Sequence, residues 1–593
     1  MRRNRTRSPH PMAAAVWFAR GCAAALALAG GPASAAHAQA DPETPALAWR
    51  SAIDSIFEAW NGTATPGCVC AVSSDTELLF EGAYGMANLE LGVPLDPNSV
   101  FYVASVSKQF VAGSVALLSV RGELELQADA RALMPELGGI GRPIPVRALA
   151  QHTSGLRDYF SLFRLAGRHE LDHLDNRRVL RMLARQRSLE FAPGERYAYS
   201  NSNYVLLAEL VERASGSPLG EFAERELFGP LGMHHTAFED DHRRVVPGRV
   251  ASYGFEDGQY RRFLKEFDVV GDGGALSTAR DLAAWGRNLL RPSVGGEAWV
   301  GLMTTPGTLA DGSPLDYGLG TRLGEVDGVA TIGHTGSLKG FRTRVVAFPE
   351  RALVVVVLCN AADANANRLS EAVARRLLSA GEAARRPQAE AHVGAEQADE
   401  ETAEPAALHL TEDQLAKWAG HYWSDSEALA RDIYLREGKL FYEREDGDRE
   451  LVAERPDRFS MPGFGIPITF QFRRGEGGER RLTIRVADFQ TIDFREYAPV
   501  SMSDVDAAAL IGAYGSVELG VSYEIRASGG GLELLVAGDH DPAPLRPVMR
   551  GLFLATVDGS PYTLRFDGGE AEATGFSLAS GLSHGLRFTR VRS

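Results

Sequence analysis

The last third of the chain repeats itself, and this repeat limits the folds open to that part more than any other feature. Two units have matching residues at corresponding places. Gly420-His421-Tyr422 and Gly512-Ala513-Tyr514 stand at their starts, Gly438 and Gly530 in their interiors, and Phe494-Arg495 and Phe588-Thr589 at their ends. Both units read as short strands with turn residues between them. We therefore predict two small antiparallel β-barrel domains, over residues 411–498 and 504–593.

Upstream of the repeat, two regions of the chain differ in composition and in hydrophobic pattern. Residues 379–408 are dominated by Ala, Glu, Gln and Arg and contain no aromatic residue, which predicts a solvated linker. Residues 46–378 alternate strand-like and helix-like segments. Apolar residues recur at helical spacing over 105–120, and Pro349-Glu350-Arg351 separates two strand-like runs. Adjacent strand pairs mixed with helices predict an α+β domain, an antiparallel sheet covered by helices.

The N-terminus has the pattern of an export signal. An Arg-rich start, an Ala/Leu run over 22–29 and the small-residue site Ala38-Gln39-Ala40 predict a signal peptide over residues 1–40. A disordered Ala-rich tail is the alternative. Arg20 interrupts the apolar stretch, which leaves Met12 open as the start and weakens a lipoprotein interpretation at Cys22. We expect a periplasmic or secreted protein with no membrane span after signal removal.

The charge of the chain bears on its partners. The first forty residues hold five arginines and no Asp or Glu, so their removal takes the formal net charge from −15 to −20. Such an acidic protein repels phosphate backbones, and we expect no nucleic-acid partner. We expect a small peptide, amide or ester substrate instead, and a homodimer is possible.

The cysteines and histidines do not predict a bridge or a metal. After signal removal Cys68, Cys70 and Cys359 remain, and an odd number is no disulfide framework. We expect all three to be buried as small hydrophobic residues. His234 and His235 are adjacent rather than spaced as zinc ligands are, so we expect no metal and no cofactor.

Ser105-Val106-Ser107-Lys108 is the first chemical signal. Ser105 falls at the start of the predicted helix, and residues three apart share a helix face, so the Lys108 amine returns beside the hydroxyl. A serine needs a base to become a nucleophile, and a desolvated neutral lysine can be one, whereas arginine cannot. The chain has only five lysines, which adds weight to this one. The alternative is a surface lysine beside a helix cap.

Two further segments could complete a site. In Tyr199-Ser200-Asn201, the phenol could shuttle a proton and the amide could anchor a substrate and brace the lysine, although turn chemistry explains the same residues. In His334-Thr335-Gly336, an extended strand could pair with substrate, and the N–H of Ser337 could join that of Ser105 in holding an oxyanion. An ordinary Gly-rich turn is the alternative for this second segment.

The order Ser-x-x-Lys, Tyr-x-Asn, His-Thr-Gly resembles the motifs of the serine β-lactamase-like hydrolases, which include β-lactamases, DD-peptidases, D-aminopeptidases and related esterases. Further segments share the resemblance: residues 101–110, Gln151-His152-Thr153-Ser154-Gly155-Leu156, Phe191-Ala192-Pro193-Gly194-Glu195, Gly273-Gly274-Ala275-Leu276-Ser277 and residues 333–341. The resemblance covers about residues 46–378. It implies a β-lactamase-like catalytic domain of the α+β class.

The resemblance also implies roles for the motif residues. Ser105 is the expected nucleophile, Lys108 its base, Tyr199 the proton relay to the leaving group, and Asn201 a substrate-positioning residue. Thr335, Gly336 and Ser337 are the expected substrate-binding strand. His334 stands where most members have a lysine that helps hold a substrate carboxylate. Neutral histidine is a weaker anion anchor, so β-lactamase activity is less expected, and compensation by Arg342 or Lys339 is the alternative.

In architecture the chain is most similar to the D-aminopeptidase branch, which joins this catalytic domain to two β-barrels and has histidine in the third motif. The resemblance implies that the two barrels predicted here are lipocalin-like. In that branch a loop of the last barrel reaches the active site and limits cleavage to free N-termini. The corresponding loop here lies near residues 538–542, so the resemblance implies that Asp539 or Asp541 pairs with the substrate ammonium. An exposed acidic hairpin tip is the alternative.

A rival motif and rival functions remain. Gly581-Leu582-Ser583-His584-Gly585 matches a nucleophile elbow, but it lies in an all-β unit with only eight residues after it, so we interpret it as a turn.

Our leading hypothesis is a secreted serine hydrolase forming an acyl-enzyme on Ser105, an aminopeptidase or amidase on D-amino-acid substrates. The alternatives are an esterase or β-lactamase/DD-peptidase-like enzyme on the same residues, or a non-enzymatic penicillin-binding-like sensor.

Overall fold

The structure is a computed structural model, and it describes ten stretches of the chain: residues 45–169, 172–265, 267–385, 408–443, 447–462, 468–475, 477–486, 490–538, 540–567 and 573–591. The predicted signal peptide, most of the predicted linker and Asp539 lie outside these residues. The chain divides into a short unit ending at Leu47 and a large unit from Ala48 to Ser593. The sheets and barrels below belong to the large unit.

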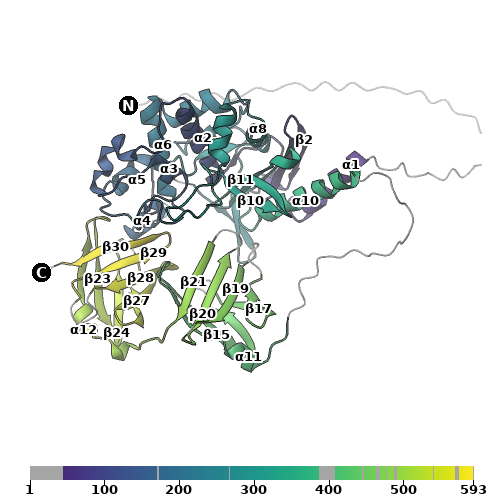
Figure 1. The fold of residues 1–593 in the computed structure, drawn as a ribbon. Helices are drawn as coiled ribbons and strands as arrows, with labels where there is room; N and C mark the ends of the chain where they lie inside the picture. Colours follow the sequence, from purple (N-terminus) through teal and green to yellow (C-terminus); the bar gives the residue numbers. More distant parts are fainter. Residues whose placement is uncertain are drawn as a thin grey trace, which may run out of the picture. The chain divides into compact units, whose positions relative to one another are not determined.

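A six-stranded antiparallel sheet forms the base of the first domain (Figure 1). Its strand order is β10 (Arg322–Val326), β11 (Val329–Leu338), β12 (Phe341–Phe348), β13 (Leu353–Cys359), β1 (Cys68–Ser74) and β2 (Leu78–Tyr84). Strands from the two ends of the domain therefore meet at the β13–β1 pair. The expected hairpin around Pro349-Glu350-Arg351 is confirmed as β12 and β13.

Both faces of this sheet are covered by helices. Strand β13 is apolar at every position and therefore buries side chains on both faces. Val354, Val356 and Leu358 join one core with Leu282 and Trp285 of α8 (Ala279–Leu290). The alternate residues Val355 and Val357 join a second core with Val373 of α10 (Ala366–Arg385) and with α1 (Pro45–Ile56). This is the period-2 consequence of strand geometry: successive side chains point to opposite faces.

A helical layer packs beside the sheet, around α2 (Ser107–Val120). Every residue from Ser107 to Leu118 is buried, and Gly113 lets α2 approach the rings of Trp285 and Trp299. The other helices here are α3 (Val146–Ala150), α4 (Tyr159–Leu165), α5 (Asn176–Leu183), α6 (Asn201–Ser215), α7 (Leu219–Ala223) and α9 (Gly296–Thr304). Short strands complete the domain: β3 (Met86–Asn88), β4 (Val93–Pro94), β5 (Phe101–Tyr102), β6 (Ala237–Phe238), β7 (Ser252–Glu256), β8 (Gln259–Phe263) and β9 (Ala275–Ser277).

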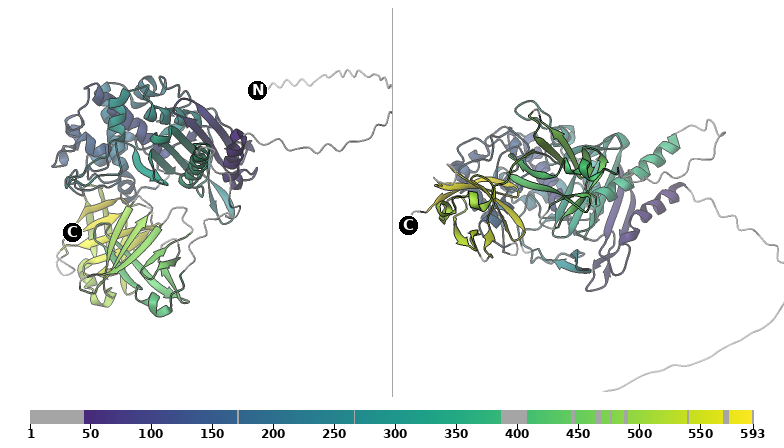
Figure 2. Two further views of the ribbon diagram at one scale, coloured as in Figure 1. Left: turned by 45° about the vertical axis from the view of Figure 1, so that its right-hand side comes forward. Right: turned by 90° about the horizontal axis from the view of Figure 1, so that it is seen from below.

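The repeated region forms two sets of antiparallel strands (Figure 2). The first is a closed barrel of β14 (Gly420–Ser424), β15 (Leu429–Arg436), β16 (Lys439–Tyr442), β17 (Arg449–Arg455), β18 (Arg458–Ser460), β19 (Ile468–Arg474), β20 (Arg480–Val486) and β21 (Gln490–Glu496), preceded by α11 (Glu412–Ala416).

The second set is a nine-stranded sheet that nearly closes. Its members are β22 (Gly512–Ser516), β23 (Val521–Ser528), β24 (Gly531–Leu535), β25 (Ala543–Pro544), β26 (Arg546–Met549), β27 (Leu552–Val557), β28 (Ser560–Phe566), β29 (Gly575–Ser580) and β30 (Ser583–Arg590), preceded by α12 (Ala507–Leu510). Its two edge strands, β25 and β26, are separated in the chain by Leu545 alone. The predicted fold class, a β-lactamase-like α+β domain followed by two small antiparallel barrels, is confirmed.

The expectation for the cysteines was wrong for two of the three. Cys68 and Cys359 form a disulfide across the β1–β13 pair, where the register places them directly opposite each other. Only Cys70 is free and buried among the described residues, as expected. An odd cysteine count leaves one thiol over and does not exclude a bridge.

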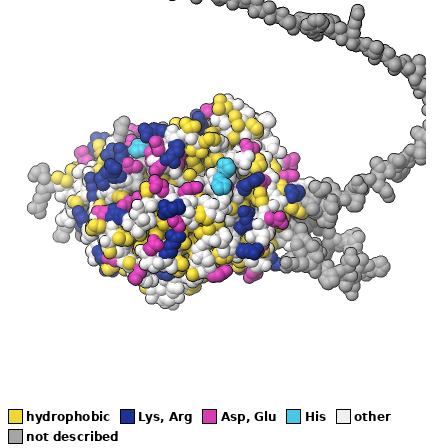
Figure 3. Space-filling model, turned by 90° about the horizontal axis from the view of Figure 1, so that it is seen from above, with side chains coloured by type: hydrophobic (Ala, Val, Ile, Leu, Met, Phe, Trp, Pro, Cys, Tyr) yellow, Lys and Arg dark blue, Asp and Glu magenta, His cyan; other side chains and the backbone are white. Residues whose placement is uncertain are grey.

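Two surface observations concern membranes and charge. None of the helices in the described stretches is long and apolar enough to cross a membrane. On the face drawn in Figure 3, several basic side chains lie close together toward the left of the view, and basic and acidic side chains are intermixed over the rest.

Candidate active site

Ser105 lies in a tight turn that joins β5 to α2. The turn is a single 3₁₀ turn, Ala104–Val106, and α2 begins two residues after Ser105. Ala104 has a φ of +48°, a left-handed conformation that costs a non-glycine residue about 1 kcal/mol. Ser107 stabilises the turn, since its hydroxyl donates to the Ala104 carbonyl at 2.6 Å and accepts from the Ala275 N–H at 3.1 Å. Ser105 itself is only half-buried, so its hydroxyl is reachable.

The Lys108 amine lies next to this hydroxyl in a fully buried position. Its Nζ is 3.1 Å from Ser105 Oγ, 2.9 Å from Asn201 Oδ1 and 2.6 Å from the Asp272 carbonyl oxygen. The last two oxygens can only accept, so each takes one N–H of the amine. A neutral amine then has its lone pair left for the Ser105 O–H. The geometry thus allows proton transfer from serine to lysine.

Tyr199 contacts Ser105 from the other side. Its phenol donates to Ser105 Oγ at 3.1 Å. The His152 ring packs against the Tyr199 ring with centroids 4.2 Å apart, which holds the phenol in place. Burial lowers the pKa of His152 well below its usual value, with the Lys108 charge second, so His152 is a neutral packing partner. The structure therefore brings together the four residues predicted from two separate motifs: Ser105 and Lys108 from the first, and Tyr199 and Asn201 from the second.

Two buried carboxylates that the sequence analysis did not single out stand behind these groups. Asp158 caps α4 and, with Oδ2, accepts both the backbone N–H and the side-chain Nδ2 of Asn201 at 2.8 Å. Because Asn201 Nδ2 points at Asp158, its Oδ1 must point at Lys108, which fixes the orientation of the amide. Burial raises the pKa of Asp158 and raises that of Asp272 to about 6.

The third motif forms an exposed strand edge beside the nucleophile. At Gly336 a Cβ atom would clash with the Val103 carbonyl oxygen and with Thr343 Oγ1, so only glycine lets β11 pass this close to the Ser105 turn. Strand β10 pairs with β11 only as far as Gly333, which leaves the edge of β11 free beyond that point.

The hairpin register sets which groups face that edge. Leu338 pairs with Phe341 across a two-residue turn, so their backbone groups bond to each other. Alternation along the strand then turns the backbone N–H and C=O of Thr335 and Ser337 toward the free edge. The placement agrees with the predicted use of Thr335, Gly336 and Ser337, whose substrate-binding role stays a prediction.

His334 is buried and uncharged. Burial lowers its pKa well below the usual value, and the positive charges of Arg322 and Lys108 lower it further. Its Nδ1 lies 2.6 Å from the Thr335 carbonyl oxygen and must carry the proton, so Nε2 accepts from the Tyr317 phenol at 3.0 Å. Both ring nitrogens are thus occupied by the protein, and His334 offers no positive charge to a substrate carboxylate.

The acidic loop of the second barrel comes close to the backbone of the segment after α4. The backbone at Gly538 packs against that at Gly167, just after α4. Asp541 is exposed, and no hydrogen bond or ion pair joins the described part of this loop to Ser105, Lys108 or Tyr199. The pairing of Asp541 with a substrate ammonium therefore stays a prediction without a contact to support it. Asp539 lies outside the described residues.

A different loop of the second barrel does reach the residues behind the site. The β29–β30 hairpin, whose turn is formed by Gly581 and Leu582, places Ser583 Oγ 3.2 Å from the Asp158 carbonyl oxygen. The His584 N–H donates to Glu190 Oε1 at 2.6 Å, and its carbonyl accepts from Arg157 Nε at 2.8 Å. This is the Gly-x-Ser-x-Gly segment. It joins two strands and leads into no helix, as expected, but only Gly581 and Leu582 form the turn, and Ser583 is the first residue of β30.

Residues 53–380, more than half of the 593, match the profile of the family described as beta-lactamase. The chain belongs to the beta-lactamase family. Together with its relatives, this match makes it a serine hydrolase of that family.

Several curated relatives of this beta-lactamase family member are named D-aminopeptidase. The protein from Gluconobacter oxydans (strain 621H) is 30% identical over 297 residues, which are 50% of this chain and 56% of that protein, so the similarity spans little more than half of that relative. The protein from Cereibacter sphaeroides (strain ATCC 17023) is 27% identical over 567 residues, 91% of this chain and 98% of that protein.

Solved structures resemble the chain over a longer stretch than the family match. An octameric penicillin-binding protein homologue from Pyrococcus abyssi has a TM-score of 0.50 at 18% identity, covering 76% of this chain and 99% of that one, which shows the fold alone. The crystal structure of SurE has a TM-score of 0.52 at 25% identity, covering 77% and 100%.

Glu190, which holds the β29–β30 turn, makes stability depend on pH. Burial raises its pKa from 4.5 to about 7. The folded protein keeps this proton between these two pH values while the unfolded chain has released it, so the contribution is complete below pH 4.5 and is lost as pH rises through 7. We expect Glu190→Gln to remove a fall in unfolding free energy on the order of 3 kcal/mol between pH 5 and 8.

Urea unfolding of both proteins across that pH range measures the effect. Glu90→Gln, at an exposed carboxylate paired with Arg262, is the matched control and should leave the wild-type pH dependence unchanged. Parallel curves for the wild type and Glu190→Gln would show that Glu190 does not hold a proton in the folded protein near pH 6.

Proposed function

We propose that this protein is an exported hydrolase that cleaves D-amino-acid amides or peptides with a free amino terminus, through an acyl-enzyme on Ser105. The observation that carries the proposal is the contact of Ser105 Oγ with both Lys108 Nζ and the Tyr199 phenol, each at 3.1 Å. A hydroxyl between two proton-handling groups suits a two-step acyl transfer.

The proposed chemistry uses only groups of this chain. Lys108 accepts the Ser105 proton as Oγ attacks the substrate carbonyl, and Asn201 keeps the amine in place through Oδ1. The N–H groups of Ser105 and Ser337 hold the developing oxyanion, and Tyr199 relays the proton that Lys108 took from Ser105 to the departing amine. Water then attacks the acyl-enzyme by the reverse proton path and releases the acid.

The choice of substrate rests on two observations. The relative from Cereibacter sphaeroides that is similar along 91% of this chain is named a D-aminopeptidase. The neutral, fully bonded His334 removes the cation that would favour a substrate carboxylate at this position, which argues against β-lactams and D-Ala-D-Ala termini. A non-enzymatic sensor would not need the intact contacts among Ser105, Lys108 and Tyr199.

Export is part of the proposal as well. The Arg-rich, Ala/Leu-rich start of the chain has the pattern of a signal peptide. The Cys68–Cys359 disulfide supports the same compartment, because disulfides persist outside the reducing cytosol. Detection of a mature chain without its first forty residues in the periplasm or medium would test this, and an uncleaved chain retained in the cytosol would contradict it.

A substrate panel tests the activity. We expect the highest kcat/KM for D-Ala-p-nitroanilide, at least about tenfold above L-Ala-p-nitroanilide, p-nitrophenyl butyrate and nitrocefin, because a tenfold ratio needs only about 1.4 kcal/mol of selective binding. N-acetyl-D-Ala-p-nitroanilide is the matched substrate without a free ammonium and should be poor. A preference for the butyrate or nitrocefin would replace the proposal with an esterase or a β-lactamase.

A further inference from the structure

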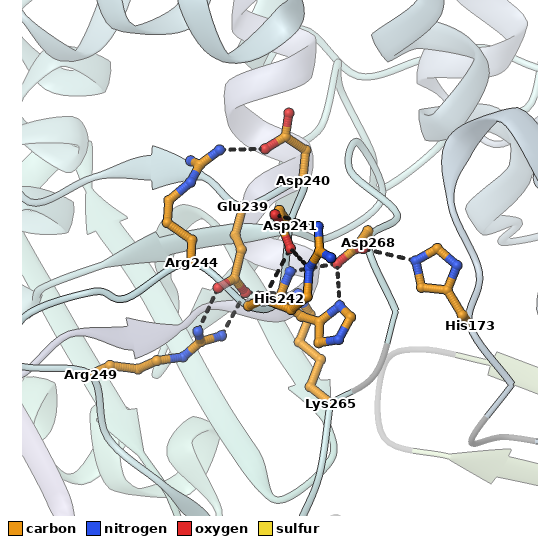
Figure 4. A network of polar contacts seen from close by, with 10 residues as sticks. His173, Glu239, Asp240, Asp241, His242, Arg244, Arg249, Lys265 and Asp268 are labelled. Carbon is orange, nitrogen blue, oxygen red and sulfur yellow. Dashed lines mark hydrogen bonds and ion pairs between the residues drawn. The ribbon is translucent and has the colours of Figure 1, made fainter.

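A second polar cluster, outside the Ser105 site, joins three loops of the first domain (Figure 4). His173 precedes α5, His242 follows β6, and Asp268 precedes β9. His173 Nε2 lies 2.9 Å from Asp268 Oδ2, and His242 Nδ1 lies 2.9 Å from Asp268 Oδ1. One ligand atom from each residue lies within 4.8 Å of the other two.

The charges around the cluster single out Asp268. The three other carboxylates drawn in Figure 4 all have arginine or lysine partners: Glu239 with Arg249 and Lys265, Asp240 with Arg244, and Asp241 with Arg243. Asp268 instead meets two imidazoles and the His242 N–H, and no ion pair joins it to a lysine or arginine of the described chain. A bound cation would neutralise the carboxylate that the protein leaves to histidines.

The three ligands are held in place by backbone contacts. The Asp268 N–H donates to the Leu174 carbonyl at 2.7 Å, which ties the segment of Asp268 to that of His173. The His242 N–H donates to Asp268 Oδ1 at 2.6 Å, which ties the third loop to the same carboxylate. Ligands from three segments thus converge without needing a rearrangement of the chain.

The cluster also opens onto a cavity. Its volume is about 490 Å³, and His173 and His242 line it together with Tyr102, Lys339 and Phe341. The side chains of His173 and His242 are 42% and 28% exposed, so an ion can reach them from solvent. Two imidazole nitrogens and one carboxylate form the donor set of many zinc sites that keep a coordination position open.

We propose that His173, His242 and Asp268 bind one divalent transition-metal ion of the Zn²⁺ type, with its remaining coordination positions open to this cavity. The ion takes the place of the two histidine–aspartate hydrogen bonds and joins three loops. The loop that carries Asp268 continues to Asp272, whose carbonyl oxygen accepts a hydrogen bond from the Lys108 amine. The metal therefore also stiffens the segment behind the catalytic lysine.

Metal titration of the full-length, chelator-treated protein tests the proposal. We expect one equivalent of Zn²⁺ by calorimetry, one equivalent of Co²⁺ with the visible absorption of a low-coordinate N/O site, and a higher melting temperature when Zn²⁺ is saturating. Asp268→Asn, which keeps the size of the side chain, and the double variant His173→Ala/His242→Ala should each weaken binding by roughly tenfold or more and reduce the melting shift at the same Zn²⁺ concentration.

His421→Ala is the control, because His421 pairs with Asp432 at 2.7 Å but has no second histidine on that carboxylate among the described residues. It should bind Zn²⁺ as the wild type does. His173→Ala alone removes a side chain that is 42% exposed, and it serves if the double variant does not fold. Absence of stoichiometric binding, or equal affinity of the wild type and the Asp268→Asn variant, would overturn the proposal and leave a hydrogen-bonded His–Asp–His cluster.

Discussion

Replacing Lys108 with methionine is expected to lower kcat for D-Ala-p-nitroanilide by roughly 10²–10⁴-fold, the range that a positioned proton-transfer group contributes. Methionine keeps an unbranched stem in the buried position but has no nitrogen to take the Ser105 proton. Lys108→Arg keeps a positive charge and hydrogen-bond donors but cannot lose its proton, so it should be about as inactive.

The Lys108 variants also have a structural cost that must be measured apart from activity. Lys108→Met leaves Asn201 Oδ1 and the Asp272 carbonyl without their donor, and each unpaired buried acceptor costs about 1–3 kcal/mol. Circular dichroism and urea unfolding check that the variant is folded at the assay temperature. Lys439→Met, at an exposed lysine in the first barrel, is the control and should be fully active. An active Lys108→Arg enzyme would exclude lysine as the base.

Loss of the Cys68–Cys359 disulfide is expected to lower the unfolding free energy by about 2–5 kcal/mol. The bridge closes a loop with a sequence separation of 291 residues, and a long loop gains much freedom in the unfolded chain when its bridge is cut. It also joins β1 to β13, the pair at which the two ends of the catalytic domain meet.

The measurement is guanidinium unfolding of wild type and Cys68→Ala/Cys359→Ala, each with and without a phosphine reductant. Reductant should destabilise the wild type and leave the double variant unchanged. Cys70→Ala, at the free buried cysteine two residues away, is the matched control and should keep its sensitivity to reductant. A wild type whose stability ignores the reductant would show that the two thiols are not bridged in solution.

Local patterns predicted the features of this fold and site that depend on short-range spacing. The three-residue spacing from Ser105 to Lys108 brings the amine back to the hydroxyl within one turn. The repeated Gly-x-Tyr starts predicted the two barrels. The disulfide was missed because Cys68 and Cys359 become neighbours only through the register of β1 with β13.

The supporting groups of the site were missed for the same reason. Asp158 and Asp272 act through Asn201 and Lys108, and nothing in the sequence near either aspartate shows this contact. The sequence around Ser583 predicted a turn, whereas Ser583 itself begins β30, and its place beside Asp158 depends on how the second barrel packs on α4. The loop around Gly538, predicted to approach the site, packs at Gly167, and its pairing with a substrate ammonium stays a prediction.

Covalent labelling tests the central claim most directly. The mature protein is treated with a fluorophosphonate, its intact mass is measured, and the labelled peptide is mapped. The account predicts one adduct on the wild-type protein, on Ser105. The Ser105→Ala variant should form no adduct and should not hydrolyse D-Ala-p-nitroanilide. An adduct on Ser583 or any other serine, or hydrolysis that survives in Ser105→Ala, would contradict it.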